Sequence, residues 1–254
     1  MINIFFIGSG NLAYALADAF SKTNISISGI YSRNIDTGSA LADMVKTKFY
    51  PKIDKTIPIA DVYLLAVPDN QILTAAEILH NEAFAVHCSG LTDIKALNRF
   101  KHFGVFWPIQ SFSKNFSYNF EKIPICIEAN TDENFSILEQ LADKISKNVQ
   151  HIDSQKRKYI HLAAVFANNF SNHMFYLAQK ISKNNNFDFN ILKPLIQETV
   201  NKLNKLSPLE AQTGPALRGD TNTIIEHLTL LQNKPEIRQL YEIISYSIQN
   251  SKND

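Results

Sequence analysis

The fold of this chain is decided by its opening stretch, Ile2-Asn3-Ile4-Phe5-Phe6-Ile7-Gly8-Ser9-Gly10-Asn11-Leu12-Ala13. An apolar run typical of a buried strand leads into a Gly-x-Gly-x-x-Ala turn, and a helical pattern follows the turn. In that context Gly8 permits the tight turn, Gly10 lets the backbone approach a pyrophosphate, and Ala13 lets the helix pack on the strand. The helix N-terminus adds N–H donors and a positive dipole. The stretch therefore favours a dinucleotide site over its two alternatives, an ordinary glycine turn and the similar start of many methyltransferases.

The rest of the first 150 residues alternates short apolar runs with helical patterns. Further strands are expected at residues 25–31, 61–67, 84–87, 104–107 and 123–128, and helices at 11–22, 36–46, 70–80, 93–100 and 131–147. Strands and helices that alternate in this way form right-handed crossover units around a parallel sheet. The pattern predicts an α/β fold, with a doubly wound parallel Rossmann sheet that binds the nucleotide in residues 1–150.

Residues 151–254 carry helical patterns only. A run without proline or glycine extends from Asp153 to Lys183, and further helical stretches cover 189–206, 220–231 and 235–250. The segment 207–220 contains two prolines and two glycines and is expected to be a loop. Asp153 and Asp220 are the expected N-caps of the helices that follow them. The second half is therefore predicted to be an all-helical domain for substrate binding and dimerisation.

The end of the second expected strand indicates which dinucleotide binds. An NAD site usually has an acidic residue there, whereas this chain has Tyr31-Ser32-Arg33-Asn34 and no acid before Asp36. Arg33 can pair with a 2′-phosphate, and Ser32 and Asn34 can hydrogen-bond to it. A solvated surface arginine is the alternative. The segment predicts NADP rather than NAD as the cofactor.

Other strand ends are expected to border the same cofactor, because ligands of doubly wound sheets bind beyond the carboxyl ends of the strands. Val67-Pro68 and Ser89-Gly90 stand at two such ends, and the neighbouring His87 and Cys88 are more typical of packed residues than of catalytic ones. The complete set of expected cofactor-binding residues is Gly8, Ser9, Gly10, Asn11, Leu12, Ser32, Arg33, Asn34, Val67, Pro68, Ser89 and Gly90.

Longer segments carry a resemblance to a known family. They are Phe106–Lys114, Ile123–Glu128, Tyr159–Asn169 and Thr213–Asp220. With the glycine turn, the Ser32-Arg33 pair and Ala66-Val67-Pro68-Asp69, they make the chain similar to the pyrroline-5-carboxylate reductase-like group, which includes reductases that pair NADP with a deazaflavin. The closer resemblance is to a bacterial family with a Rossmann domain and a C-terminal DUF2520 domain. It implies a Rossmann domain followed by a helical domain of the kind that mediates dimerisation in related reductases, and it names no substrate.

The catalytic candidates come from the needs of hydride transfer to C=N or C=O, which are a proton donor and groups that orient the substrate. His161 and Asn168 are seven residues apart on the long expected helix, so we expect them on one face, with His161 as the proton donor. Arg218, in the glycine- and proline-rich loop, can clamp a substrate carboxylate. A structural pair at a domain interface is the alternative for His161 and Asn168. The run Lys156-Arg157-Lys158 is expected to be a solvated helix face.

Charge and cysteine content argue against several function classes. The 254 residues include 25 Lys and Arg and 24 Asp and Glu, a net charge of +1, which argues against broad electrostatic capture of nucleic acid or of an anionic membrane. We expect no signal peptide and no membrane span, and the two cysteines, Cys88 and Cys126, offer no zinc-ligand spacing. These features predict a cytoplasmic protein without a bound metal.

Two hypotheses for function remain. The first is an NADP(H)-dependent oxidoreductase that transfers a hydride to a small imine or carbonyl metabolite. The second is a non-catalytic NADP-binding or sensing protein with a helical dimerisation module. Under both hypotheses we expect a homodimer, because apolar side chains on the helices call for a partner surface. These side chains are Phe166, Phe170, Phe175, Leu228, Leu231 and Tyr241.

Overall fold

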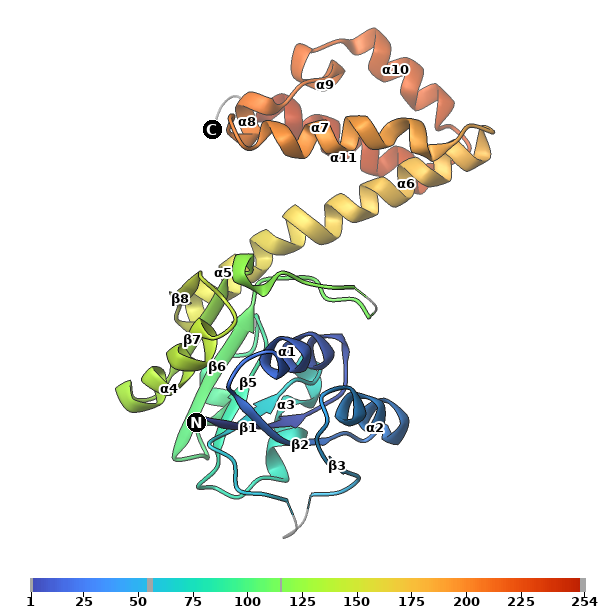
Figure 1. The fold of residues 1–254 in the computed structure, drawn as a ribbon. Helices are drawn as coiled ribbons and strands as arrows, with labels where there is room; N and C mark the ends of the chain where they lie inside the picture. Colours follow the sequence, from blue (N-terminus) through green and yellow to red (C-terminus); the bar gives the residue numbers. More distant parts are fainter. Residues whose placement is uncertain (1, 54–56, 115, 252–254) are drawn as a thin grey trace. The chain divides into compact units, whose positions relative to one another are not determined.

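The computed structural model describes residues 2–53, 57–114 and 116–251. The chain divides into two compact units, Met1–Asn169 and Phe170–Asp254. The first unit is an α/β structure built on one sheet, and the second is built of helices (Figure 1). The predicted fold class, a Rossmann-type sheet followed by a helical part, is confirmed.

The sheet of the first unit has eight strands in the order β3-β2-β1-β4-β5-β6-β7-β8. The strands are β1 (Asn3–Ile7), β2 (Ser26–Tyr31), β3 (Phe49–Tyr50), β4 (Val62–Leu65), β5 (Phe84–His87), β6 (His102–Pro108), β7 (Ile125–Ala129) and β8 (Val149–His151). Strand order reverses between the neighbours β1 and β4. At such a switch point the adjacent connections diverge and leave a crevice beyond the carboxyl ends of the strands.

Helices cover both faces of this sheet, and the side chains of β1 alternate between them. Ile4 and Phe6 belong to one buried apolar cluster, and Phe5 and Ile7 belong to the other. The first cluster includes residues of α1 (Asn11–Ser21), α2 (Ile35–Met44) and α4 (Asp132–Asp143), and the second includes residues of α3 (Ile72–Glu77). Because both faces are covered, the opening strand is a continuous apolar run rather than an alternating one.

Strands β6 and β7 differ from the expected parallel arrangement. They pair antiparallel, with Phe106 opposite Ile127, whereas β7 and β8 are again parallel. In its described part, the connection from β6 to β7 contains only the 3-10 turn η3 (Phe120–Lys122) and no crossover helix. A parallel neighbour requires such a crossover. The expectation of a fully parallel sheet is therefore wrong at this pair.

Several short elements were missed or overestimated from sequence patterns. The expected helix at 70–80 is a 3-10 turn, η1 (Asp69–Gln71), followed by the short α3, and the expected helix at 93–100 is the 3-10 turn η2 (Ile94–Leu97). Strands β3 and β8 were not expected, because two or three residues are too few to display a strand periodicity. Each of these elements lies outside the β1–α1–β2 unit that carries the glycine turn.

The first unit extends past the expected boundary near residue 150. It includes β8 and α5 (Ser154–Ala164), whose N-cap is Asp153 as predicted, with the carboxylate accepting from the backbone N–H of Lys156 at 2.7 Å. A π-helical segment, η4 (Val165–Phe170), follows α5. The expected uninterrupted α-helix over 153–183 is therefore wrong. The seven residues from His161 to Asn168 do not make two regular α-turns, because a π-turn contains more residues than an α-turn.

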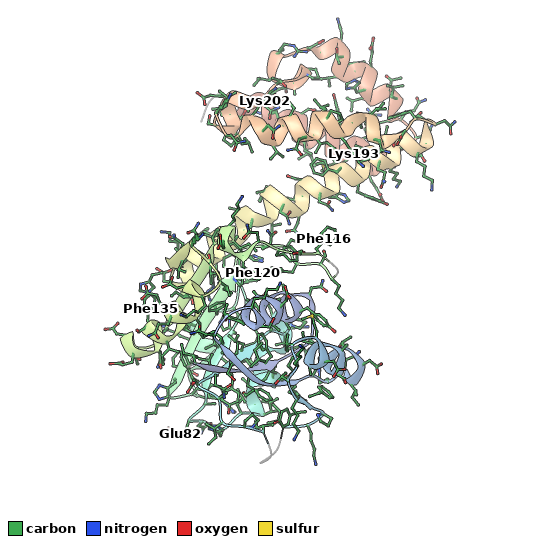
Figure 2. The ribbon with its side chains drawn as sticks, viewed as in Figure 1. Glu82, Phe116, Phe120, Phe135, Lys193 and Lys202 are labelled. Atoms are coloured by element: carbon green, nitrogen blue, oxygen red, sulfur yellow. The ribbon has the colours of Figure 1, made fainter. Side chains whose placement is uncertain are left out.

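The second unit consists of helices joined by short connections. They are α6 (Ser171–Asn184), η5 (Phe189–Leu192), α7 (Lys193–Lys202), α8 (Pro208–Ala211), α9 (Pro215–Arg218), α10 (Thr221–Leu230) and α11 (Pro235–Asn250). Lys193 and Lys202 mark the two ends of α7 in Figure 2. The segment expected as a loop contains the short helices α8 and α9, each with proline in its first turn. Asp220 caps α10 as predicted, accepting from the backbone N–H of Thr223 at 3.2 Å.

Candidate functional site

A cavity of about 360 Å³ opens beyond the carboxyl ends of β1, β2 and β4, at the switch point of the sheet. Eight of the predicted cofactor-binding residues line it: Gly8, Ser9, Gly10, Ser32, Arg33, Asn34, Val67 and Pro68. Thr37, Gln71, Thr74, Ala75 and Ile78 line it as well and were not singled out from the sequence. The structure thus brings together three chain segments that are separate in the sequence.

The two glycines of the turn face different surroundings. Gly8 has a φ of +116°, and a Cβ built there would lie 2.3 Å from the carbonyl oxygen of Ala66 at the end of β4. Its N–H donates to the carbonyl of Tyr31 at 2.8 Å, which ties the turn to the end of β2. Gly10 has an ordinary φ of −77°, and a Cβ there would meet open space. Gly8 is therefore required by the fold, whereas the fold alone would accept a side chain at Gly10.

The geometry at Gly10 fits a dinucleotide. Gly10 is the N-cap of α1, and no side chain of the described residues caps the helix with a hydrogen bond or places an acidic group in its first turn. The first backbone N–H groups of a helix lack partners within the helix and favour an anion beside them. The open space over Gly10 would be filled by a Cβ at the position where a pyrophosphate approaches these donors. The residues present therefore fit the diphosphate of a nicotinamide dinucleotide.

A cluster of hydroxyl groups joins the glycine turn to the start of α2. Ser9 Oγ lies 2.7 Å from Ser32 Oγ and 2.6 Å from Thr37 Oγ1, and the side chains of Ser9 and Ser32 are buried. Ser32 Oγ also accepts from the backbone N–H of Asn34 at 3.2 Å. Thr37 was not identified from the sequence, although its position one helical turn after Asn34 was the available signal. The cluster fixes the distance between the two turns that line the cavity.

Arg33 and Asn34 occupy the rim of the cavity. Arg33 is exposed, so its guanidinium reaches a ligand at the surface without a cost of burial. Asn34 caps α2, its Oδ1 accepting from the backbone N–H of Thr37 at 3.0 Å. This capping contact occupies an oxygen, which leaves the donor end of the amide as the part that can face an anion. The segment presents donors and a cation but no carboxylate of its own at this edge.

The remaining predicted cofactor residues, Asn11, Leu12, Ser89 and Gly90, are not part of the lining of this cavity. Asn11 and Leu12 form the first turn of α1, and Asn11 Nδ2 donates to the carbonyl of Phe112 at 3.0 Å. The ring of Phe112 stacks 5.7 Å from Phe120, a residue labelled in Figure 2. The loop after β6 is thereby attached to the helix N-terminus that is expected to bind the pyrophosphate.

The segment Ser89–Gly90 follows β5 and contacts two aromatic side chains. A Cβ built at Gly90 would lie 2.6 Å from Cδ2 of His161 and 2.7 Å from Cζ2 of Trp107. The rings of Trp107 and His161 are 5.9 Å apart and tilted by 49°. Ser89 Oγ accepts from the backbone N–H groups of Leu91 at 3.1 Å and Thr92 at 2.9 Å. His161 therefore lies directly against one of the predicted cofactor-binding segments.

The three predicted catalytic residues lie in different parts of the chain. His161 is half-buried on α5, and Asn168 is exposed in the π-helical segment, so both belong to the first unit. Arg218 is exposed at the end of α9 in the second unit. Only His161 is joined by a described contact to a cofactor-binding candidate.

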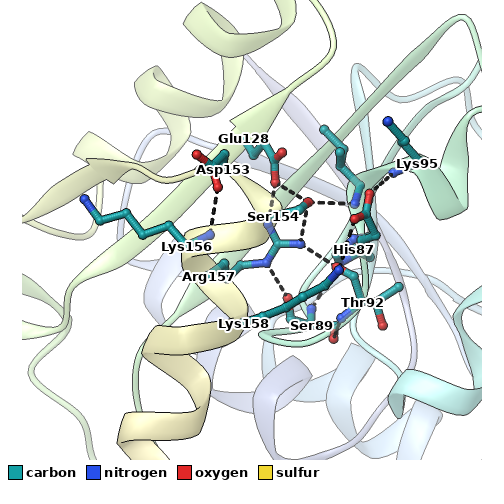
Figure 3. Close-up of polar contacts among 12 residues, drawn as sticks. His87, Ser89, Thr92, Lys95, Glu128, Asp153, Ser154, Lys156, Arg157 and Lys158 are labelled. Carbon is teal, nitrogen blue, oxygen red and sulfur yellow. Dashed lines mark hydrogen bonds and ion pairs between the residues drawn. The ribbon is translucent and has the colours of Figure 1, made fainter.

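A buried charged cluster at the start of α5 was missed from the sequence (Figure 3). Arg157 is completely buried, so the expectation that the run of basic residues 156–158 is a solvated face is wrong at its central residue. Arg157 forms an ion pair with Glu128 and donates to the backbone carbonyls of Ser89, at 3.2 Å, and Thr92. Ser154 Oγ donates to Glu128 at 2.7 Å and accepts from Arg157 at 3.1 Å. A buried guanidinium is stable only with such a full set of partners.

His87, at the end of β5, is a buried and uncharged neighbour of this cluster. Burial and the positive charge of Arg157 lower its pKa to about 3, and these effects outweigh an opposite contribution from the backbone of Asp93. Its Nδ1 accepts from the backbone N–H of Ser89 at 3.2 Å, so the hydrogen resides on Nε2. His87 and Cys88, whose thiol pKa burial raises to about 12, are packed residues and present no reactive group near neutral pH.

The described residues hold neither a candidate metal centre nor a candidate membrane-spanning helix. Residues 2–53, 57–114 and 116–251 contain no group of three or more His, Cys, Asp or Glu side chains arranged to hold a metal ion. In the same part of the chain, no helix combines the length and the apolar character needed to cross a membrane.

The sequence matches two family models, one in each half. The model described as "NADP oxidoreductase coenzyme F420-dependent" matches residues 3–87, which contain the glycine turn and the Ser32-Arg33 pair. The model "Domain of unknown function (DUF2520)" matches residues 123–248. No curated protein matches the sequence.

Solved structures resemble the chain over its whole length. The "putative NADP oxidoreductase BF3122 from Bacteroides fragilis" is 37% identical, with a TM-score of 0.91 and 98% of each chain covered. Protein TM1727 from Thermotoga maritima is 24% identical, with a TM-score of 0.77 and coverage of 96% of this chain and 99% of that one. The 1-pyrroline-5-carboxylate reductase from Streptococcus pyogenes is 12% identical, with a TM-score of 0.65 and 98% of each chain covered, which is a likeness of fold.

Proposed function

The chain belongs to the family of NADP oxidoreductases whose C-terminal part is the DUF2520 domain, and we propose that it is an NADPH-dependent reductase of a small imine or carbonyl compound. The observation that supports this most strongly is the cavity at the switch point of the sheet, where the open space over Gly10 meets the uncapped start of α1. That cradle suits a diphosphate that carries a nicotinamide.

The preference for NADP over NAD is part of the proposal and rests on the end of β2. An acidic side chain there would accept from a ribose 2′-hydroxyl and repel a 2′-phosphate. The cavity instead presents Arg33 with Ser32 and Asn34, a cation between two groups able to donate hydrogen bonds. Arginine is suited to phosphate because its planar fork donates two parallel hydrogen bonds.

The proposed chemistry needs one proton and one hydride. When bound, the reduced nicotinamide supplies the hydride to the carbon of C=N or C=O. His161 donates a proton to the nitrogen or oxygen as negative charge develops there, since an imidazole can carry a proton near neutral pH. Its contact with Gly90 is what supports this role. For Asn168 and Arg218, orientation of the substrate and pairing with a substrate carboxylate stay predictions.

An imine is the first substrate class to test. The pyrroline-5-carboxylate reductase whose fold this chain resembles is named for a substrate with a cyclic C=N bond. Reduction of an imine near neutral pH benefits from a donor that protonates the nitrogen, the task assigned to His161. Carbonyl compounds require the same donor and are the second class.

The test is turnover of NADPH with a panel of small cyclic imines and 2-keto acids. Turnover is measured as the decrease in the absorbance of the reduced nicotinamide, and the reduced product is identified. The proposal expects product from at least one class, and a marked loss of turnover in His161→Gln. The exposed His173 provides the matched control, His173→Gln, which should keep wild-type turnover. Tight NADPH binding without turnover across the panel, including assays with an added deazaflavin, would instead support a non-catalytic NADP-binding protein.

We also infer that the chain forms a homodimer in a reducing, cytoplasmic setting. The helical part exposes many large apolar side chains. Among them are Tyr176, Leu195 and Leu230, whose exposed fractions are 54%, 65% and 77%. An exposed apolar surface of this extent is typical of a subunit interface. Of the residues named for the interface, Phe166 and Phe170 are exposed, whereas Leu231 is buried. Cys88 and Cys126 are both buried free thiols.

A further inference from the structure

Arg157 connects three separate elements of the first unit. It extends from α5, pairs with Glu128 of β7, and donates through Nε and a terminal nitrogen to the carbonyls of Ser89 and Thr92 in the segment between β5 and η2 (Figure 3). Ser154, one turn earlier on α5, extends the connection, since its Oγ accepts from the backbone N–H of Ile94 at 2.9 Å. The side chain of Arg157 has no exposed surface.

The segment held by Arg157 is the segment that contains Gly90. The two carbonyls that accept from the guanidinium, those of Ser89 and Thr92, flank Gly90 on either side. Inside this loop, Ser89 Oγ accepts from the backbone N–H groups of Leu91 and Thr92. The loop is therefore fixed twice, by its own serine and by the arginine from α5.

His161 follows Arg157 by one helical turn. Residues four apart on an α-helix lie one above the other on the same face, so both side chains project from α5 toward the segment that follows β5. Arg157 contacts the carbonyls of the loop, and His161 Cδ2 occupies the space beside Gly90. A change in the hydrogen bonds from Arg157 to the loop would therefore shift the loop relative to the imidazole of His161.

The shape of the guanidinium explains why arginine stands at this position. Its donors point in three fixed directions in one plane, which here serve a carboxylate, two carbonyls and the hydroxyl of Ser154. A lysine ammonium has three donors on a flexible stem and cannot reproduce this planar set.

We propose that Arg157 is a positioning residue of the site. It holds the Ser89–Thr92 loop at a fixed distance from His161, so that a nicotinamide bound at the loop lies within reach of the proton donor. The assignment rests on the proposed function, because it takes the loop as a cofactor contact and His161 as the donor. Arg157 itself acts through these groups and, being buried, does not touch the substrate.

The chain carries its own reporter of this geometry. Trp107 is the only tryptophan in the sequence, and it lies beside both Gly90 and His161. A protonated imidazole next to an indole quenches its emission, so a pH titration of Trp107 fluorescence without cofactor reads the contact between Trp107 and His161. His161→Gln should abolish this pH-dependent quenching and thereby assign it.

The variant to test is Arg157→Lys, which keeps the charge and removes the planar donor set. We expect it to lose most of the pH-dependent quenching of Trp107 and to bind NADPH about tenfold more weakly, because the displaced loop no longer meets the cofactor in the right position. The matched control is Arg99→Lys. Arg99 likewise donates to backbone carbonyls, those of Ala76 and Leu79 at 3.1 and 2.8 Å, and no described contact joins it to the Ser89–Thr92 loop or to His161. This control should keep both the quenching and the NADPH affinity of the wild type.

The result that would overturn the proposal is wild-type quenching and wild-type NADPH affinity in Arg157→Lys. If that variant does not fold, Ser154→Ala removes the hydroxyl that contacts Glu128, Arg157 and the backbone N–H of Ile94, and it should reduce the quenching in the same direction. An unchanged signal there would equally contradict the proposal. Failure of wild-type protein to bind NADPH would contradict the proposed function instead. The cofactor-free quenching would still decide the role of Arg157.

Discussion

Gly8 and Gly10 stand two residues apart, yet the constraints on them have different origins. A side chain at Gly8 is excluded by the carbonyl of Ala66 and by a positive φ, so the exclusion belongs to the folded chain itself. A Cβ built at Gly10 would meet open space, so a steric penalty there comes from a ligand rather than from the folded chain. The two positions therefore separate the requirements of folding from those of binding.

We predict that Gly10→Ala lowers stability by no more than the change of N-cap residue, about 0.5–1 kcal/mol, and abolishes detectable NADPH binding, because the methyl group fills the space of the pyrophosphate. Gly8→Ala should lower stability by about 1–3 kcal/mol as well as binding, since the residue must keep a φ that is strained for alanine. Urea denaturation and NADPH titration of both variants provide the measurement. Wild-type affinity in a folded Gly10→Ala protein would contradict the assignment of the cradle.

The buried His87 makes the stability of the first unit dependent on pH. Its folded pKa of about 3 lies below the unfolded value of about 6.5, so between these values the unfolded chain binds a proton that the folded chain does not. The free energy of unfolding should fall by about 1.4 kcal/mol per pH unit below 6.5 from this group. We predict that His87→Asn, which keeps an acceptor for the N–H of Ser89, flattens the urea-derived stability profile between pH 4 and 6. The exposed His173→Gln should retain the wild-type slope, and an equal slope in all three proteins would refute the prediction.

Residue identities alone revealed the glycine turn but not the buried arginine. The motif at Gly8 and Gly10 carries its context with it, since a strand precedes it and a helix follows. Arg157 stands between two lysines, and such a run of basic residues is typical of a solvent-exposed helix face. The available signal was helical phase, because Arg157 shares a face with Ser154 and with the partly buried Ile160. Its partners Ser89 and Glu128 are far away in the sequence and could not be read from it.

At the scale of secondary structure, α5 matters most to the site because it carries both Arg157 and His161. The helix starts at Asp153, whose carboxylate accepts from the backbone N–H of Lys156. We predict that Asp153→Ala destabilises the protein by about 1 kcal/mol through loss of this cap, whereas Asp153→Asn costs little because asparagine caps equally well. Urea denaturation of the two variants is the measurement. Equal losses of stability in both would show that the charge, and not the cap, is what matters.

Elements were predictable where the pattern was long enough to have a period. The strands β1, β2, β4 and β5 and the helices α1, α2 and α4 were found with small errors in their bounds. The short strands β3 and β8 show no period, and the antiparallel β7 is decided by the missing crossover before it, which a local pattern does not display. The π-helical segment likewise has no sequence pattern that distinguishes it from a continuous α-helix.

At the scale of the whole molecule, the exposed apolar surface of the helical part predicts a second copy as its partner. We expect light scattering at micromolar concentration to give twice the chain mass of 28.7 kDa. Replacement of an exposed apolar residue such as Leu230 by glutamate should shift the mass toward the monomer if that residue lies in the interface, since a buried unpaired charge is costly. A wild-type monomeric mass would contradict the prediction.

The central claim is that the cavity between the ends of β1, β2 and β4 binds NADPH in preference to NADH, with Arg33 paired to the 2′-phosphate. Isothermal titration of the wild type and of Arg33→Ala with both nucleotides tests it most directly. The account predicts that the wild type binds NADPH at least about tenfold more tightly than NADH, and that Arg33→Ala loses this preference while its NADH affinity stays unchanged, as expected for one charged hydrogen-bonded contact. Equal dissociation constants for the two nucleotides in the wild type would contradict it.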